Sequence, residues 1–263
     1  MRTNDHTFCV LAYRESPYLE KCIYSLMRQT KRSEIIISTS TPSPYIQRIA
    51  KNHGLDILVN EKSSGIASDW SFAYKNAKTR YVTLAHQDDI YYPGYTEACL
   101  NFAERYKNNL ITFTGYHELL ESKTFGFRLN LIIKKLILTP FFLFGRNLSS
   151  RPLKSAILSL GSPISCPSVM YNKEKIGRFE FSEDFQISLD WDAWLRLADE
   201  SGDFVFIGER LMAHRIYESS ETSRGIGEKI RMEEDLAILR RIWGDPIGIV
   251  MAKIYALSYR SNR

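Results

Sequence analysis

The chain has 263 residues, of which 44% are hydrophobic and 25% are charged, and its formal net charge is +5. This composition is typical of a soluble globular protein and excludes disordered and fibrous classes. The length is enough for one sizeable core, or for one core with a small appendage. No internal repeat is present, which excludes solenoids and propellers.

The four cysteines lie far apart and form no C-x-x-C pair. They predict small apolar residues in a reducing compartment rather than a disulfide or zinc framework. The sequence begins without the apolar segment of a signal peptide. We therefore expect a cytoplasmic protein, or one bound peripherally to the inner face of a membrane.

Positive charge is distributed unevenly along the chain. Eight lysines and arginines and no acidic residue lie between Ser122 and Lys173, and no acidic residue follows Asp245. Such asymmetry favours an anionic partner that particular segments bind. No recognised nucleic-acid-binding module accompanies these charges, so we expect no nucleic-acid partner.

The first half of the chain alternates between strand and helix patterns. Strands are predicted over residues 7–11, 34–38, 55–59, 81–85 and 110–114. Helices are predicted from residue 18 and over residues 45–52, 66–77 and 93–106. This alternation indicates an α/β fold with a mostly parallel central sheet flanked by helices. Ligands of such sheets bind at the carboxyl ends of the strands.

Acidic residues cluster in the loop after the strand at 81–85, where the sequence reads His86-Gln87-Asp88-Asp89. Two adjacent carboxylates repel each other unless a cation lies close by. Mg²⁺ or Mn²⁺ suits such a pair, with water and substrate phosphates completing the coordination. The alternative is a helix N-cap followed by a turn, because aspartate is common before helices.

Several motifs occur in an order that resembles the GT-A-fold glycosyltransferases of family 2, of the bacterial surface-polysaccharide type. The resemblance covers about residues 7–223. The motifs are Ala12-Tyr13, Gly65 with Ala77 and Tyr81, the Asp88-Asp89 loop, Ser165-Cys166-Pro167-Ser168, the segment from Asp190 to Ala198, and the segment from His214 to Thr222. Each motif is loose by itself, and their order makes the resemblance specific.

The resemblance implies a role for individual residues. Asp88 and Asp89 would bind Mn²⁺ or Mg²⁺, with Asp88 as the principal ligand. Asp190 would be the general base that accepts the proton of the acceptor hydroxyl. The residues implied to bind the donor are Ala12, Tyr13, Glu15, Ser38, Gly65, Gln87, Asp89, Arg215 and Tyr217.

The implied activity is metal-dependent transfer of a sugar from a nucleotide-diphosphate sugar, with a UDP-sugar favoured. The acceptor would be a hydroxyl of a glycan or of a polyprenyl-diphosphate-linked sugar in surface polysaccharide biosynthesis. One base and no covalent intermediate imply inversion of the anomeric configuration. A sugar-nucleotide pyrophosphorylase is disfavoured, because residues 12–17 are not a glycine-rich loop.

The sequence departs from the family pattern in three places, and the first two, at residues 38–41 and at His86, support an alternative function, against which the intact Asp88 and Asp190 count. Residues 38–41 read Ser-Thr-Ser-Thr where the family often has Asp-Asp-Gly-Ser, and His86 and Tyr217 stand where metal-binding residues are expected. The alternative is a catalytically weakened GT-A subunit that acts as a binding partner of another glycosyltransferase.

Other polar residues of the motifs have competing explanations. Asp190 and Asp192 both suit the first turn of a helix, where acids complement the macrodipole. We favour a catalytic role for Asp190 and a structural role for Asp192. We interpret His214 as a hydrogen-bonded surface residue.

Four regions are predicted from these patterns. Residues 1–223 form the GT-A catalytic domain, with a nucleotide-sugar-binding half at 1–115, a basic apolar insertion at 119–160 and an acceptor and catalytic half at 161–223. Residues 224–263 form a helical extension. The apolar and basic residues at 128–154 suit an interfacial membrane helix. The alternative is that they pack on the protein's own core or form a homodimer interface.

Overall fold

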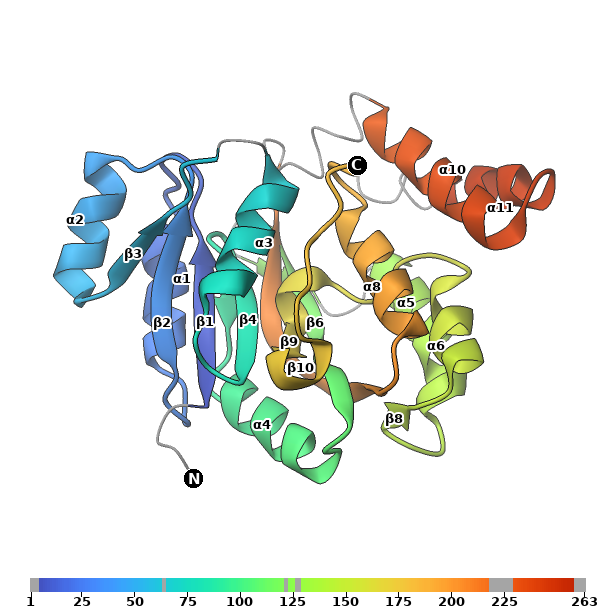
Figure 1. The fold of residues 1–263 in the computed structure, drawn as a ribbon, viewed down its shortest axis with the longest axis horizontal. Helices are drawn as coiled ribbons and strands as arrows, with labels where there is room; N and C mark the ends of the chain where they lie inside the picture. Colours follow the sequence, from blue (N-terminus) through green and yellow to red (C-terminus); the bar gives the residue numbers. More distant parts are fainter. Residues whose placement is uncertain (1–4, 63–64, 121–122, 126–128, 218–228, 258–263) are drawn as a thin grey trace.

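The computed structural model describes residues 5–62, 65–120, 123–125, 129–217 and 229–257. Within these residues one mixed sheet crosses the molecule, in the strand order β3-β2-β1-β4-β9-β6-β10-β5, with β7 beside β6 and β8 beside β10. Figure 1 shows this sheet with helices in front of it and behind it. The predicted mostly parallel α/β fold is therefore confirmed.

The first half of the chain builds four parallel strands. The elements are β1 (His6–Leu11), α1 (Leu19–Met27), β2 (Glu34–Thr39), α2 (Pro44–His53), β3 (Asp56–Val59), α3 (Ile66–Asn76) and β4 (Tyr81–His86). Local sequence explains their limits. Ser43 caps α2 by accepting a hydrogen bond from the Ile46 N–H, and Gly54 ends the helix in the left-handed region at φ 63°.

The second half adds the strands β6 and β10, which are parallel to each other, and the strands β5, β7, β8 and β9, which are antiparallel to their neighbours. Its elements are β5 (Ile90–Tyr91), α4 (Tyr95–Arg105), β6 (Asn109–Leu120), β7 (Lys123–Phe125), α5 (Leu129–Phe142), β8 (Asn147–Leu148), α6 (Arg151–Leu158), the 3₁₀ turn η1 (Cys166–Ser168), β9 (Val169–Asn172), α7 (Lys173–Ile176), α8 (Leu189–Asp199), β10 (Asp203–Ile216), α10 (Ile230–Trp243) and α11 (Ile247–Leu257). Strand β9 runs antiparallel to both β4 and β6, so β6 and β10 run parallel to β4. The carboxyl ends of β1, β4 and β10 consequently lie at one edge of the sheet.

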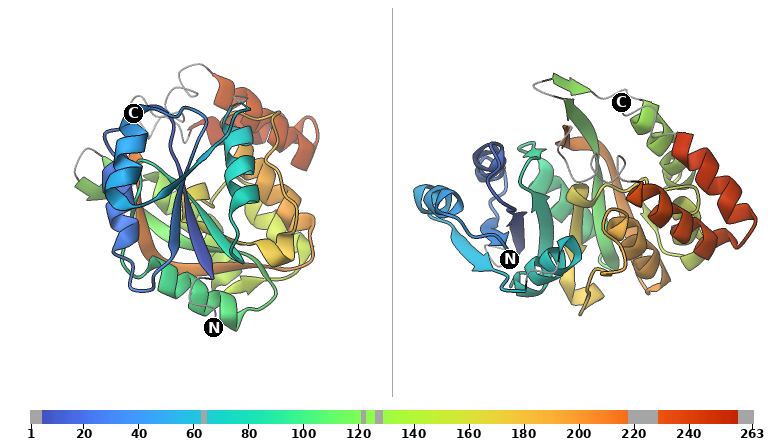
Figure 2. Two further views of the ribbon diagram at one scale, coloured as in Figure 1. Left: turned by 60° about the vertical axis from the view of Figure 1, so that its left-hand side comes forward. Right: turned by 90° about the horizontal axis from the view of Figure 1, so that it is seen from above.

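Two hydrophobic cores cover the two faces of the sheet. Helices α1, α2 and α4 pack on one face, and helices α3, α6, α8 and α10 pack on the other. Figure 2 shows these two layers from the side and from above. All four cysteines are buried and free, as expected for small apolar residues.

Helices α5 and α6 contain the predicted basic segment, and the structure uses several of its cations internally. Lys154 donates hydrogen bonds to the carbonyls of Glu200 and Gly202, at 2.6 and 2.8 Å. Lys134 donates a hydrogen bond to the Tyr116 hydroxyl at 2.8 Å. Lys173, which follows the segment in α7, donates hydrogen bonds to the carbonyls of Lys75 and Ala77. Only part of the positive charge expected to meet an anionic partner therefore remains at the surface. No helix of the described residues is long and apolar enough to cross a membrane.

Candidate active site

The loops after β1 and β4 are joined at the carboxyl edge of the sheet. The side-chain amide of Gln87 accepts a hydrogen bond from the Tyr13 N–H and donates one to the Tyr13 carbonyl, both at 3.0 Å. Gln87 thus holds two loops in register, a role that differs from the implied contact with a sugar. The main chain after Gln87 turns back toward His86, whose carbonyl accepts the Asp89 N–H at 3.2 Å.

This turn brings an imidazole and two carboxylates together. One ligand atom from each of His86, Asp88 and Asp89 lies within 4.8 Å of the others. Helix α4 begins only at Tyr95 with Gly94 as its N-cap, so the N-cap alternative for the two aspartates is wrong. The cluster, by contrast, is what the metal hypothesis requires.

The protonation of the cluster suits a divalent cation. Burial lowers the pKa of His86 to about 4, so its ring is neutral, and its Nε2 is buried without a hydrogen-bond partner among the described residues. Burial, together with the charge of Asp89, raises the pKa of Asp88 to about 6. A cation would relieve both features, because it pairs with the carboxylates and gives the imidazole nitrogen a partner. The residues present therefore fit Mn²⁺ or Mg²⁺, and His86 joins the implied ligands Asp88 and Asp89.

Asp89 is held from strand β10. Its fully buried carboxylate accepts the Arg215 N–H at 2.9 Å and contacts His214 Nδ1 at 3.0 Å. Burial lowers the pKa of His214, but the neighbouring Asp89 carboxylate outweighs this and raises it to about 9. The raised pKa favours an imidazolium paired with Asp89 at neutral pH. His214 is hydrogen-bonded, as we interpreted it, but it is only 28% exposed and its partner is the buried Asp89 of the candidate site.

The end of β10 also positions Asp88. The Arg215 Nε donates to the Asp88 carbonyl at 2.9 Å, and its guanidinium lies 4.0 Å from the centre of the Tyr18 ring. The Tyr217 hydroxyl hydrogen-bonds the Asp88 carboxylate. Tyr217 therefore supports Asp88 at the place where a third metal ligand was expected. The rest of the predicted closing loop, residues 218–222, lies outside the described residues.

The other implied donor residues lie around the same edge of the sheet. The Ala12 N–H binds the Ser38 carbonyl at 2.9 Å, and the Ser38 side chain is buried. Tyr13 and Glu15 are exposed beside them. Gly65 precedes α3 with φ 106°, a conformation that other residues rarely adopt. Its backbone conformation, rather than the surrounding space, explains why glycine stands there.

Sequence analysis missed a carboxylate at this edge. Asp69, in the first turn of α3, accepts hydrogen bonds from Ser40 Oγ at 2.7 Å and from Asn60 Nδ2 at 2.8 Å. It thereby places a negative charge next to residues 38–41, where the family's usual aspartates are replaced. An acidic residue four positions after Gly65 was the available indication.

Asp190 lies in the first turn of α8, and its carboxylate accepts the Trp191 N–H at 2.7 Å. Burial raises its pKa, while the charges of Arg231 and Lys134 act in the opposite direction. Asp192 instead forms ion pairs with Arg196 and Arg241, at 2.8 and 2.7 Å. These pairs agree with a structural role for Asp192.

Cys166, in η1, is buried between these acidic groups in electrostatic terms, because the charges of both Asp190 and Asp89 raise the pKa of its thiol beyond the effect of burial. The charge of Lys134 likewise affects both sides, since it lowers the pKa of Asp190 and of His214. Asp190 is therefore near enough to the Asp88-Asp89 loop for both to act on the same neighbouring groups.

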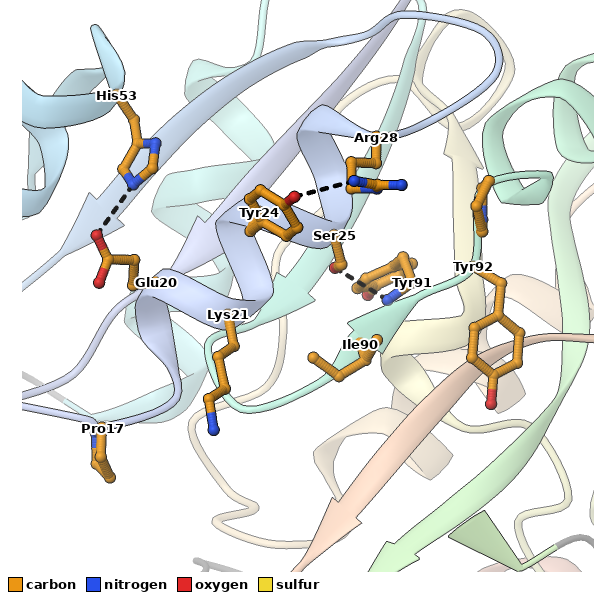
Figure 3. Close-up of a pocket in the computed structure, with 11 residues that line it drawn as sticks. Pro17, Glu20, Lys21, Tyr24, Ser25, Arg28, His53, Ile90, Tyr91 and Tyr92 are labelled. Carbon is orange, nitrogen blue, oxygen red and sulfur yellow. Dashed lines mark hydrogen bonds and ion pairs between the residues drawn. The ribbon is translucent and has the colours of Figure 1, made fainter. Parts of the chain in front are cut away.

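A separate groove of about 690 Å³ lies between α1 and the β5–α4 connection (Figure 3). Lys21, Tyr24, Arg28, Ile90 and Tyr92 are among its lining residues. It includes none of Asp88, Asp89 and Asp190, so it is not the candidate active site.

Comparison with known proteins places the chain in a family. The sequence model of glycosyl transferase family 2 matches residues 7–170. The chain belongs to glycosyl transferase family 2. Uncharacterized glycosyltransferases of Rickettsia typhi and Rickettsia prowazekii are each 25% identical to it, over 82% and 84% of the chain. The chain spans 65% and 67% of the length of these two relatives.

Solved structures show the same fold at low identity. The chain is similar to S. aureus TarS 1-349 in complex with UDP-GlcNAc (TM-score 0.60, 14% identity, 83% of this chain and 60% of that one). It is also similar to the mannosyltransferase PcManGT of Pyrobaculum calidifontis in complex with GDP-Man and Mn²⁺ (TM-score 0.61, 11% identity, 98% and 75%). These likenesses confirm the GT-A fold expected of a family 2 member.

Proposed function

We propose that the protein transfers a sugar from a nucleotide-diphosphate sugar to a hydroxyl group of an acceptor. The observation that carries this proposal is the cluster of His86, Asp88 and Asp89 at the carboxyl edge of the sheet, with the half-buried Asp190 as the proposed base. A donor site and a base are the two parts that such a transfer needs. Family membership and the nucleotide-sugar complexes of the similar structures support it.

The donor would bind at the carboxyl edge of the β1–β4 sheet. Residues 1–115 supply most of this half, including Ala12, Tyr13 and Gly65 near the nucleoside. Asp88, with Asp89 and His86, would hold Mn²⁺ or Mg²⁺, which offsets charge on the leaving diphosphate when bound. Arg215 would add a fixed positive charge at the same end, because its Nε already orients it beside Asp88. We favour a UDP-sugar as donor.

Asp190 would accept the proton of the acceptor hydroxyl as that oxygen attacks the anomeric carbon and the bond to the diphosphate breaks. A partly buried carboxylate whose pKa is raised by desolvation is a stronger base than a fully exposed one. One base on the acceptor side predicts inversion. Residues 161–223 would form the acceptor half, and the acceptor would be a glycan or a polyprenyl-diphosphate-linked sugar in surface polysaccharide synthesis.

Thermal-shift measurements with nucleotide sugars, each with and without Mn²⁺, test the donor site first. A ligand that binds the native state raises the melting temperature, and we expect a Mn²⁺-dependent rise with at least one UDP- or GDP-sugar. Release of nucleoside diphosphate from that sugar then tests transfer. Donor binding without any turnover would instead favour a catalytically weakened subunit, and no shift with any nucleotide would contradict both functions.

A further inference from the structure

The outer face of α5 and of the loop that follows is apolar. Ile132 and Leu136 are exposed and four residues apart, which places them on one side of the helix, and Leu143, just after the helix, is exposed as well. Leu136 is 66% exposed, and Phe144, just beyond the helix, is 97% exposed. The opposite side of α5 packs into the core through Leu138 and Phe142. Contact with the protein's own core thus does not account for the exposed side.

Helix α11 repeats this pattern. Ile247, Val250 and Ile254 are exposed at spacings of three and four residues. The inner side is packed, because Tyr255 lies 5.4 Å from Trp191 between ring centres. The two helices lie at the same end of the molecule (Figure 2), where Lys134 of α5 and Tyr255 of α11 interact electrostatically.

Positive charge accompanies the exposed apolar residues of both helices. Lys135 lies beside Leu136, Arg146 follows Phe144, and Lys253 lies beside Ile254, all of them exposed. No acidic residue occurs between Ser122 and Lys173 or after Asp245. Two copies of this face would bring like charges together, whereas an anionic bilayer would match both its charge and its apolar side chains.

We propose that the outer faces of α5 and α11, together with Phe144, form a docking surface for an anionic lipid bilayer. The apolar side chains would enter the boundary between headgroups and acyl chains, and the three cations would contact lipid phosphates.

Vesicle flotation tests the surface without any donor or acceptor, so its outcome does not depend on the proposed function. We expect the chain to float with phosphatidylcholine vesicles containing about one third phosphatidylglycerol and to bind pure phosphatidylcholine at least tenfold more weakly. Leu136→Ser with Ile254→Ser should reduce partition to the anionic vesicles more than tenfold. Lys135→Gln with Lys253→Gln should remove most of the preference for anionic lipid.

Tyr24→Ser with Met27→Ser is the matched control, because these apolar residues are exposed on α1, away from α5 and α11. This control should float like the unaltered chain. The proposal would be overturned if the unaltered chain bound neither kind of vesicle. It would also be overturned if the control lost as much vesicle binding as Leu136→Ser with Ile254→Ser. Light scattering tests the alternative occupant. If the unaltered chain does not float but forms a dimer, and if Leu136→Ser with Ile254→Ser dissociates that dimer, the face binds a second copy of the chain instead of a bilayer.

A labelled side chain gives an independent measurement that does not require a weakened variant. The four native cysteines are buried, so Phe144→Cys can be labelled selectively with a polarity-sensitive dye. Its emission should shift to the blue with anionic vesicles, while the same dye at Met27→Cys should not change. Equal responses at the two positions would contradict docking through this face.

Discussion

The two sides of the site are built differently. The donor side is a loop between β4 and β5, and hydrogen bonds from β1 and β10 hold it at defined positions. The proposed acceptor side is Asp190 in α8, whose pKa is lowered by the charges of Lys134 of α5 and Arg231 of α10, while Tyr255 of α11 packs against the neighbouring Trp191. The proposed donor side thus depends on the sheet, and the proposed acceptor side depends on helices packed beside it.

Asp190→Asn should have the largest effect, and it should reduce catalysis without changing donor binding. This change removes the proposed base, and kcat should fall about 10²- to 10⁴-fold while donor affinity stays the same. Steady-state transfer and donor titration with the sugar found by thermal shift measure the two effects. Asp192→Asn is the control in the same helical turn, because its ion pairs to Arg196 and Arg241 predict lower stability with kcat retained. Unchanged transfer by Asp190→Asn would remove Asp190 from the mechanism.

Asp88→Ala should instead impair metal binding on the donor side. Loss of a carboxylate ligand should weaken Mn²⁺ binding at least about 10- to 100-fold, measured by electron paramagnetic resonance of free Mn²⁺. In the unaltered chain, Mn²⁺ affinity should also fall below pH about 6, because a protonated Asp88 cannot bind the ion. The exposed Asp56, at the start of β3, provides the control Asp56→Ala. Equal Mn²⁺ affinity in Asp88→Ala and Asp56→Ala would argue against the metal site.

The donor side was largely predictable from sequence because its parts are local. Strand 81–85 and the acids that follow it are contiguous, so the loop at a sheet edge could be predicted from pattern and motif order. The hydrogen bonds that reach this loop from a distance could not. His214 is 125 residues from Asp89 in the sequence, and nothing in its own neighbourhood in sequence shows that the two residues pair.

The acceptor side was less predictable for the same reason. The sequence indicated that residues 128–154 were basic and apolar, but it did not show that Lys134 points inward while Lys135 stays exposed. Nor could it show that Arg231 lies near Asp190. Such contacts depend on how helices pack on the completed sheet, and helical periodicity alone does not determine the partner of each face.

His214→Gln tests how the donor side holds Asp89. Glutamine keeps a hydrogen bond but removes the charge, so the free energy of unfolding should fall by about 1 kcal/mol at pH 6. The folded-state pKa of His214 is raised to about 9 from 6.5, so its ionic contribution is complete below pH 6.5 and is lost as pH rises through 9. Urea unfolding at pH 6 and pH 9.5 without divalent cations should show this difference disappear. A difference that grows with pH would contradict the ion pair.

The smallest expected effect concerns the charge that α5 contributes to the acceptor side. Lys134 lowers the pKa of Asp190, so Lys134→Met should raise that pKa and move the acidic limb of kcat/KM to higher pH, by less than about one unit. The base is active only when deprotonated, so the variant should lose more rate at pH 5.5 than at pH 8. Lys135→Met, which alters the exposed neighbour, should keep the original profile. A shift to lower pH, or the same shift in both variants, would show that α5 does not act on Asp190 through Lys134.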